Sequence, residues 1–298
     1  MNFATFVTMT VDGLAQGAAI SAFALALVLI WRAARVVNFA QGAMAAASAY
    51  IAVTVIQHTG SFWLGLAAAL ISGAIFGVFV ESSVMRFASH TAPLNAVILA
   101  LGSTFIIQGA LGAIYGPDLR DPGNPFSHAY RMVAGVGLPS DLNIFTFVSV
   151  ALMVVALVLL FGKTKLGLRL RASAFAPEVS RLLGINVSFM RTVGWALAAT
   201  AGALAAEVIL PTQLGVNPNA MDGVFVTAFT GAVIGGLDSP QGAVVGGLTI
   251  GLLLNYVTGH LNPLFSADLG SIAVLALLLA VLLVRPGGLF SGVAARQV

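Results

Sequence analysis

In this chain of 298 residues, Glu207 is the side chain best placed to bind a charged group or a proton. It stands in AGALAAEVILP, near the end of a long apolar segment. An ionisable side chain in such a segment is costly, and it normally faces protein or a water-filled cavity. The carboxylate could meet a cationic group on a path through the protein, or it could bond a neighbouring helix. Both interpretations stay open at this point.

Uncharged polar side chains form a second group inside or beside apolar segments. Asn38 and Gln41 share the segment NFAQGAM, which reads as a break in a helix, and Gln213 follows the segment that holds Glu207. Such groups more often bond a neighbouring helix than a ligand. Broken helices, however, also mark transport paths in membrane proteins.

Catalytic constellations are missing from the sequence. The four histidines are scattered without metal-ligand spacing, no Ser/His/Asp set or pair of carboxylates shares a site, and there is no cysteine. The phosphate loop GxxxxGK[ST] does not occur either. We therefore expect no enzyme activity, no metal and no cofactor in this chain.

The composition assigns the chain to a lipid bilayer. Hydrophobic residues make up 59% of it and charged residues only 8%, whereas ordinary soluble domains carry roughly 25% charged residues. The formal net charge is +3, but the cations flank apolar segments, as in membrane proteins. We expect no binding to nucleic acid.

Apolar runs of membrane-spanning length repeat along the chain, and a helix needs about 20 residues to cross the hydrocarbon core. They predict an all-α, polytopic transmembrane helix bundle of about eight to nine spans. The uncharged run 36–80 must hold two spans, broken at 57–61, and the seventh run is short enough to be half-inserted. The predicted spans are 13–31, two within 36–80, 95–115, 142–162, 192–210, 223–237, 241–259 and 269–284.

The cations predict the orientation. With the N-terminus outside and the C-terminus in the cytoplasm, eleven Lys and Arg residues lie inside and only two, Arg120 and Arg131, lie outside. Residues 1–298 then form a single transmembrane domain. It has an external loop at 116–141 and a cytoplasmic loop at 163–191, which holds six of the thirteen cations.

The cytoplasmic loop carries helix signals. Pro177 suits the first turn of a short helix, Glu178 suits its positive end, and Gly184 is placed to end it. Leu182 and Leu183 contribute to an apolar face. Such a helix either docks a soluble partner, with Arg169 and Arg171 beside it, or lies on lipid or on the bundle.

Four glycines in the segment PQGAVVGGLTIGLL could let helix backbones approach closely. Gly242 and Gly246 have the spacing GxxxG, and so do Gly247 and Gly251. The pattern predicts either tight packing within the chain or a sliding surface beside a path or a partner. Gln241-Gly242-Ala243 also repeats Gln41-Gly42-Ala43, which is weak support for an internal repeat.

Four segments, in the same order along the chain, resemble the permease subunits of branched-chain amino acid ABC importers. They are VVNFAQGAMAAASAY, RASAFAPEVSRLLGIN, AVIGGLDSPQGAVVGGLTIGLL and VLLVRPGGLF. The resemblance implies a multi-pass protein of the bacterial inner membrane. It also implies cytoplasmic ATP-binding subunits, a second permease subunit that differs from this one, and an extracytoplasmic binding protein.

The sequence departs from the family pattern at several positions. Phe175 and Ala176 stand where the coupling loop usually has an acid, and Gln41 and Ala43 replace the His and acid of an NFAHGE-like motif. Thr227 stands where the family often has Lys, and Glu207 stands where it often has Gly. These departures leave the substrate open.

The resemblance thus implies an ATP-driven permease for branched-chain or related amino acids, with ATP hydrolysis on another chain. Its coupling segment would include Arg169, Arg171, Pro177, Glu178, Leu182, Leu183 and Gly184. Path candidates are Asn38, Gln41, Glu207, Gln213 and Thr227, with Glu207 meeting an amino acid's ammonium group. The alternative is a stand-alone channel or an ion-coupled carrier for a small polar solute.

Overall fold

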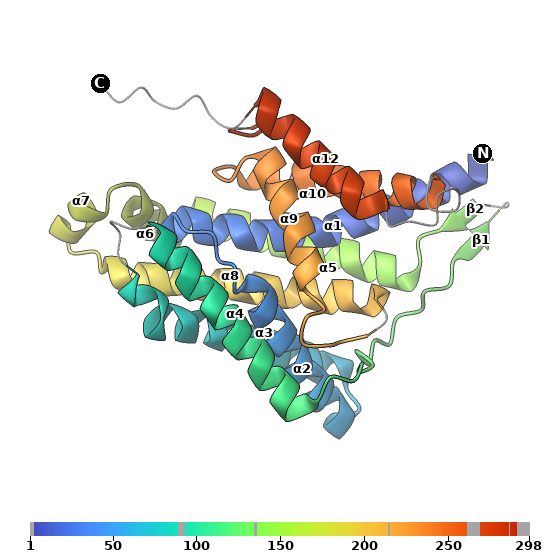
Figure 1. The fold of residues 1–298 in the computed structure, drawn as a ribbon, viewed down its shortest axis with the longest axis horizontal. Helices are drawn as coiled ribbons and strands as arrows, with labels where there is room; N and C mark the ends of the chain where they lie inside the picture. The colour runs from blue at the N-terminus through green and yellow to red at the C-terminus, as the bar shows by residue number, and fades with distance from the viewer. Residues whose placement is uncertain are drawn as a thin grey trace. The chain divides into compact units, whose positions relative to one another are not determined.

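The computed structural model describes residues 3–88, 93–133, 136–213, 215–260, 269–285 and 287–290 (Figure 1). Over these residues the chain is helical except for loops and one antiparallel hairpin, β1 (Arg131–Val133) with β2 (Val136–Leu138). The prediction of an all-α fold is confirmed for the described part of the chain.

Long helices occupy the predicted apolar segments. They are α1 (Phe3–Ala34), α2 (Gln41–Thr59), α3 (Phe62–Ser83), α4 (Pro93–Tyr115), α5 (Asp141–Lys163), α8 (Val187–Ile209), α9 (Asp222–Gly235), α10 (Pro240–His260) and α12 (Leu269–Val284). The shorter elements are α6 (Lys165–Phe175), α7 (Pro177–Leu182) and the 3₁₀ turns η1 (Met85–Phe87) and η2 (Leu210–Thr212).

Six of the described helices are long and apolar enough to cross a membrane: α1, α3, α4, α5, α8 and α10. Two more, α9 and α12, are apolar but shorter. The α2 helix has 19 residues, but it is rich in alanine and begins with Gln41, so it is less apolar than the six. The predicted eight to nine spans are therefore supported in part.

Asparagine side chains bond the backbone near the starts of two helices. The uncharged run begins at residue 36, but α2 begins at Gln41, after the break expected in NFAQGAM, where Asn38 Oδ1 accepts a hydrogen bond from the Ala40 amide at 3.0 Å. The sixth span was expected from residue 192, but α8 begins at Val187. There the Asn186 side chain caps the helix by accepting from the Phe189 amide at 3.0 Å.

Contacts between residues divide the chain into two compact units that interleave in sequence. The first unit comprises residues 1–28, 125–150 and 226–298, and the second comprises 29–124 and 151–225. The sequence predicted a single domain over 1–298. Each unit has its own close helix packing.

In the first unit, α10 packs through the four predicted packing glycines. A Cβ on Gly242 or Gly246 would overlap the backbone of α9 at Gly235 or Gly231. On the next helical faces, Gly247 lies against Ser21 and Gly251 against Gly17, both on α1. Each GxxxG pair therefore packs against one neighbouring helix: Gly242 and Gly246 against α9, and Gly247 and Gly251 against α1.

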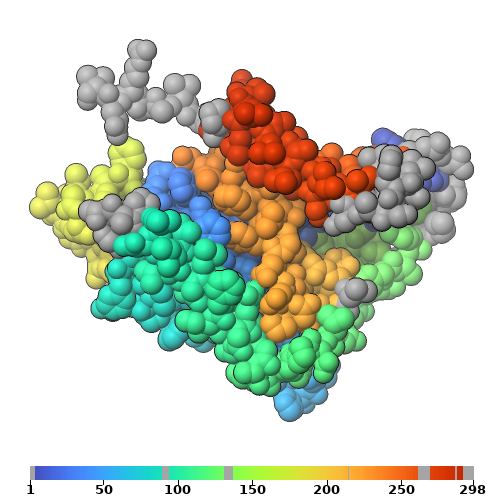
Figure 2. All heavy atoms as spheres, in the orientation of Figure 1, coloured from blue at the N-terminus to red at the C-terminus, as the bar shows by residue number. Residues whose placement is uncertain are grey.

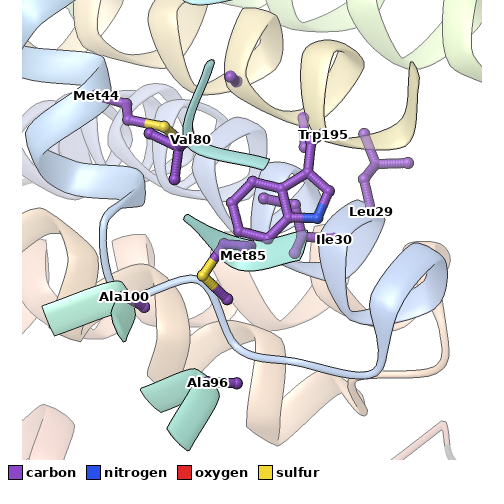
Figure 3. Packing of buried hydrophobic residues seen from close by; sticks show 10 residues of the cluster. Leu29, Ile30, Met44, Val80, Met85, Ala96, Ala100 and Trp195 are labelled. Carbon is purple, nitrogen blue, oxygen red and sulfur yellow. The ribbon is translucent and has the colours of Figure 1, made fainter. Parts of the chain in front are cut away.

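In the second unit, α2 is the central helix and packs against α3, α4 and α8. Trp195 of α8 is buried in an apolar cluster with Ile30, Val80 and Met85, and Figure 3 shows its indole ring beside these side chains. The α4 helix, teal to green in Figure 2, lies at the surface of this unit with exposed apolar side chains such as Phe105 and Ile106. Small residues in α2 and α8 permit this central position.

An ion pair ties the end of α3 to the start of α8. Glu81, only 2% exposed, accepts hydrogen bonds from Arg191 Nε at 2.7 Å and from Thr192 Oγ1 at 2.6 Å. Both carboxylate oxygens are therefore paired. These contacts anchor this end of α3 to the start of α8.

The crossing of α3 and α8 should tolerate no side chain at Gly77. A Cβ there would lie 2.5 Å from the Trp195 carbonyl oxygen and 2.8 Å from Ala199 Cβ. We expect Gly77→Ala to lower the free energy of unfolding by about 1–3 kcal/mol, measured by denaturant titration of the purified chain. Gly102→Ala is the matched control, because nothing lies within 4 Å of a Cβ there; an equal loss in both variants would contradict the packing argument.

Glu81→Gln should also destabilise the chain, because it leaves Arg191 without its buried counter-charge. We expect a loss of about 2 kcal/mol in the same titration. The control is Glu178→Gln, which removes the same charge from the exposed pair of Glu178 and Arg181 and should cost less than about 1 kcal/mol. Equal effects would mean that burial of the first pair adds nothing.

Candidate functional site

Two side-chain amides join the break before α2 to α8. Gln41 Nε2 donates to the Ala198 carbonyl at 3.0 Å, and Asn38 Nδ2 donates to Gln41 Oε1 at 3.0 Å. Both residues are fully buried. In this conformation the two path candidates bond each other and the backbone.

The surroundings fit this amide bridge closely. Gly202 lies one turn after Ala198, and a Cβ there would overlap Gln41 Nε2. From α4, Thr104 Oγ1 donates to the Phe39 carbonyl at 3.1 Å. The segment between α1 and α2 is thus held from both α4 and α8, which keeps its irregular backbone bonded inside protein.

Glu207 lies further along α8, beside a cavity of about 10 Å³, roughly the room of one water molecule. It is 6% exposed, and none of the described residues forms a hydrogen bond with its carboxylate. The rest of the lining is apolar: Ala49, Val53, Pro122, Ala206, Leu210, Pro211 and Val216. An acid without a partner among such residues is costly, by about 3 kcal/mol at the centre of a membrane.

Two loop segments border this cavity and bond each other. The Arg120 amide donates to the Val216 carbonyl at 3.0 Å, and the Val216 amide donates to the Arg120 carbonyl at 2.8 Å. The Arg120 guanidinium also donates to the Tyr115 carbonyl at 2.9 Å and lies 4.9 Å from the centre of the Tyr115 ring. Backbone pairing and this cation–π contact therefore fix the loop over Glu207's end of α8.

Sequence reasoning missed Tyr50. It is fully buried in α2, stacks on Tyr115 with ring centres 4.6 Å apart, and its hydroxyl has no hydrogen-bond partner among the described groups. A buried tyrosine normally bonds through its hydroxyl. A lone aromatic residue in an alanine-rich helix was the available signal. Tyr50 and Glu207 are thus unpaired polar groups on two helices that pack together.

The remaining path candidates lie elsewhere. Gln213 is exposed just after η2. Thr227 lies on α9, in the part of that helix that belongs to the first unit. The structure therefore groups only Asn38, Gln41 and Glu207 along the interface of α2 and α8. Among the described residues, no group of three or more metal-binding side chains occurs.

The predicted coupling loop forms two helices. The Thr164 side chain caps α6 by accepting from the Gly167 amide at 3.0 Å. Pro177 begins α7, Glu178 pairs with Arg181 at 2.7 Å, and Gly184 follows with a left-handed φ of 77°. The short helix at Pro177 is confirmed; α6, which Thr164 could have signalled, was not expected.

The α7 helix of this loop has apolar side chains that no other part of the described chain covers. Leu182 is 88% exposed and Leu183 is 75% exposed, beside the exposed Val179. Arg169 and Arg171 are exposed on α6. A helical element that displays exposed leucines and cations has the features of a protein docking surface.

Known transport proteins resemble this chain along much of its length. A probable branched-chain amino acid transport permease protein from Methanocaldococcus jannaschii, LivH, is 31% identical over 89% of this chain and 86% of its own length. A guanosine ABC transporter permease protein from Bacillus subtilis, NupQ, is 29% identical over 68% of this chain and 66% of its own.

A solved structure of PsaBC from Streptococcus pneumoniae, in complex with Fab, shares the fold. It is similar over 96% of this chain and 94% of the matched chain, with a TM-score of 0.50 and 12% sequence identity. The model of the family described as "Branched-chain amino acid transport system / permease component" matches residues 9–282. The chain therefore belongs to this family of multi-pass membrane permeases and is a transport component that is not itself an enzyme.

Proposed function

We propose that this chain carries branched-chain amino acids through the membrane for an ATP-driven importer. The observation that carries the proposal is the family match over nearly the whole chain, together with the exposed leucines of α7. The chemistry beside Glu207 also suits an aliphatic amino acid once the interface opens beyond the room of one water molecule, because the carboxylate could pair with an ammonium group and the apolar lining could contact the side chain. Guanosine, named for one relative, has no ammonium group to offer this carboxylate.

The proposed orientation has the N-terminus outside and the α6–α7 loop in the cytoplasm. The distribution of Lys and Arg supports it. An ATP-binding subunit would dock on α7, and a second, different permease subunit would complete the membrane part and dock the other ATP-binding subunit. A binding protein would deliver the substrate to the outer loops, on the side of Arg120 and Glu207.

The path would run along the interface of α2 and α8. Glu207 stands toward its outer end, and the bonded amides of Asn38 and Gln41 close it further in. Movement of α7 on ATP binding would shift α8 against α2 and break the Gln41–Ala198 hydrogen bond. This is coupling between two distant sites through a two-state packing interface.

The second candidate is a stand-alone channel or ion-coupled carrier for a small polar solute. The unpaired carboxylate of Glu207 favours it, since ionisable groups inside membranes often relay ions. The two candidates differ in one measurable property, namely whether flux requires ATP.

ATP-dependent uptake should require the leucines of α7. In proteoliposomes with all subunits, we expect wild type to take up leucine, isoleucine and valine in preference to other amino acids, amides, urea and guanosine. In the double variant Leu182→Ser, Leu183→Ser, uptake should fall at least about tenfold, because exposed leucines at the centre of an interface carry much of its free energy. ATP-binding subunits should no longer co-purify.

The matched control is Leu119→Ser, Leu138→Ser, which alters two exposed leucines of the predicted outer segments. Normal co-purification of the ATP-binding subunits with the α7 variant would contradict the docking assignment. Equal solute flux with and without ATP would contradict the importer and favour the second candidate.

Glu207→Gln should separate a transport role from a structural one. If the carboxylate serves transport, neutralising it should leave the unfolding free energy unchanged or raise it, while uptake falls about tenfold or more. Both quantities are measured on the same preparation, and Asp118→Asn, which neutralises an exposed acid of the predicted outer loop, serves as the control. Lower stability with normal uptake per folded molecule would assign Glu207 a structural role.

A further inference from the structure

Arg120 is a cation of the predicted outer loop whose contacts are all with neutral groups. Its guanidinium donates to the Tyr115 carbonyl at 2.9 Å and lies 4.9 Å from the centre of the Tyr115 ring. No acid among the described residues forms a salt bridge with it. A guanidinium carries several N–H donors, and a single one is bonded to the described residues here. The charge and most of the donors of Arg120 are therefore available to an anionic group.

The loop that carries Arg120 forms part of the wall beside Glu207. The Arg120 backbone exchanges hydrogen bonds with Val216 in both directions, at 3.0 and 2.8 Å, and Val216 lines the cavity at Glu207. Pro122, two residues further along the same loop, lines it as well. All these residues belong to the second unit. The cation is thus placed next to the cavity of the unpaired acid.

Tyr50 adds an unpaired hydroxyl to this region. Its ring stacks on Tyr115, the residue that holds the Arg120 guanidinium, with ring centres 4.6 Å apart. The Tyr50 hydroxyl is buried and has no hydrogen-bond partner among the described groups. Its helix, α2, also supplies Ala49 to the cavity wall. An acid, a hydroxyl and a cation therefore gather here without the partners that such groups normally have.

The two charges match those of one kind of solute. A free amino acid carries an ammonium group and a carboxylate on the same carbon atom. The planar fork of a guanidinium fits a carboxylate through two parallel hydrogen bonds, and opposite charges placed in this way favour the correct solute over others. Glu207 alone would suit any small cation, whereas Glu207 together with Arg120 suits a zwitterion.

We propose that Arg120 binds the carboxylate of the transported amino acid while Glu207 binds its ammonium group. This assignment rests on the proposed function and adds the residue that recognises the acidic end of the substrate. In the described conformation the cavity of about 10 Å³ has room for roughly one water molecule, so the site is closed. When the interface of α2 and α8 opens, the guanidinium leaves Tyr115 for the carboxylate, and the Tyr50 hydroxyl donates to the same group.

The test compares leucine with two analogues that each lack one charged group. Isoamylamine is leucine without its carboxylate, and isocaproate is leucine without its ammonium group. Dissociation constants are measured by saturation-transfer NMR on the purified complex of permease and ATP-binding subunits. The binding protein is left out, because its own selectivity would mask that of the membrane site.

We expect Arg120→Gln to weaken the binding of leucine and isocaproate about tenfold, through loss of the charge-assisted contact. Isoamylamine has no carboxylate to lose, so its binding should not change. Glu207→Gln should give the converse result: leucine and isoamylamine bind more weakly, and isocaproate binds as before. Arg120→Lys keeps the charge without the fork and should lose less than Arg120→Gln.

Asp121→Ala is the matched control for a loosened loop. Its carboxylate accepts a hydrogen bond from the Gly123 amide at 2.8 Å in the same loop, so the change disturbs the loop and keeps the cation. It should shift the dissociation constants of all three ligands by the same factor. If Arg120→Gln also weakened all three alike, Arg120 would only hold the loop, and the proposal would be overturned.

Unchanged leucine binding in Arg120→Gln would overturn it too, as would a wild-type complex that takes up leucine without binding it at this site. ATP-dependent leucine uptake by the complete wild-type system in proteoliposomes is measured alongside. Loss of that uptake would refute the proposed function itself. Normal uptake with the same preference for leucine over isoamylamine in wild type and Arg120→Gln would refute only the role of Arg120.

Discussion

The hydrogen bond from Gln41 to the Ala198 carbonyl joins α2 to α8, two helices that pack closely through small residues. In a membrane, lipid chains are as good an environment for apolar side chains as a neighbouring helix is. Close packing and buried polar contacts therefore hold the helices together. Here the packing residues around that bond are mostly alanine and glycine, and Gly202 makes room for the amide itself. The central position of α2, and with it the arrangement of α3, α4 and α8, depends on this combination.

The same interface explains why transport and stability could oppose each other in this chain. Asn38 and Gln41 each bond within protein through both the oxygen and the nitrogen of their amides, whereas the Glu207 carboxylate and the Tyr50 hydroxyl have no hydrogen-bond partner among the described residues. Unsatisfied buried groups are rare in native proteins and concentrate where function needs them. The interface of α2 and α8 therefore has its polar groups hydrogen-bonded around Gln41, whereas the polar groups around Glu207 lack partners among the described residues.

Much of the fold could be predicted from the sequence, because apolar runs of membrane length are strong signals. The break between α2 and α3 and the short helix at Pro177 followed from local turn and helix-end residues. The starts of α2 and α8 could not be predicted from hydropathy, since Asn38 and Asn186 decide them through single side-chain hydrogen bonds. At the candidate site, Glu207 could be singled out by its charge. Its pairing state could not, because that depends on which residues distant in sequence line its cavity, such as Ala49, Val53 and Pro122. Tyr50 gave no charge signal at all.

The hydrogen bond between Gln41 and Ala198 can form only late in synthesis of the chain. Its two residues are 157 positions apart, so at ordinary rates of synthesis the acceptor emerges on the order of ten seconds or more after the donor. During that interval α2, which is less apolar than the six long spans, holds an unpaired amide at its start. The insertion machinery, or the adjoining hairpin with α3, must keep α2 in place until α8 arrives. A substitution at Gly202 that displaced Gln41 would thus first impair the assembly of α2 with α8 during translation.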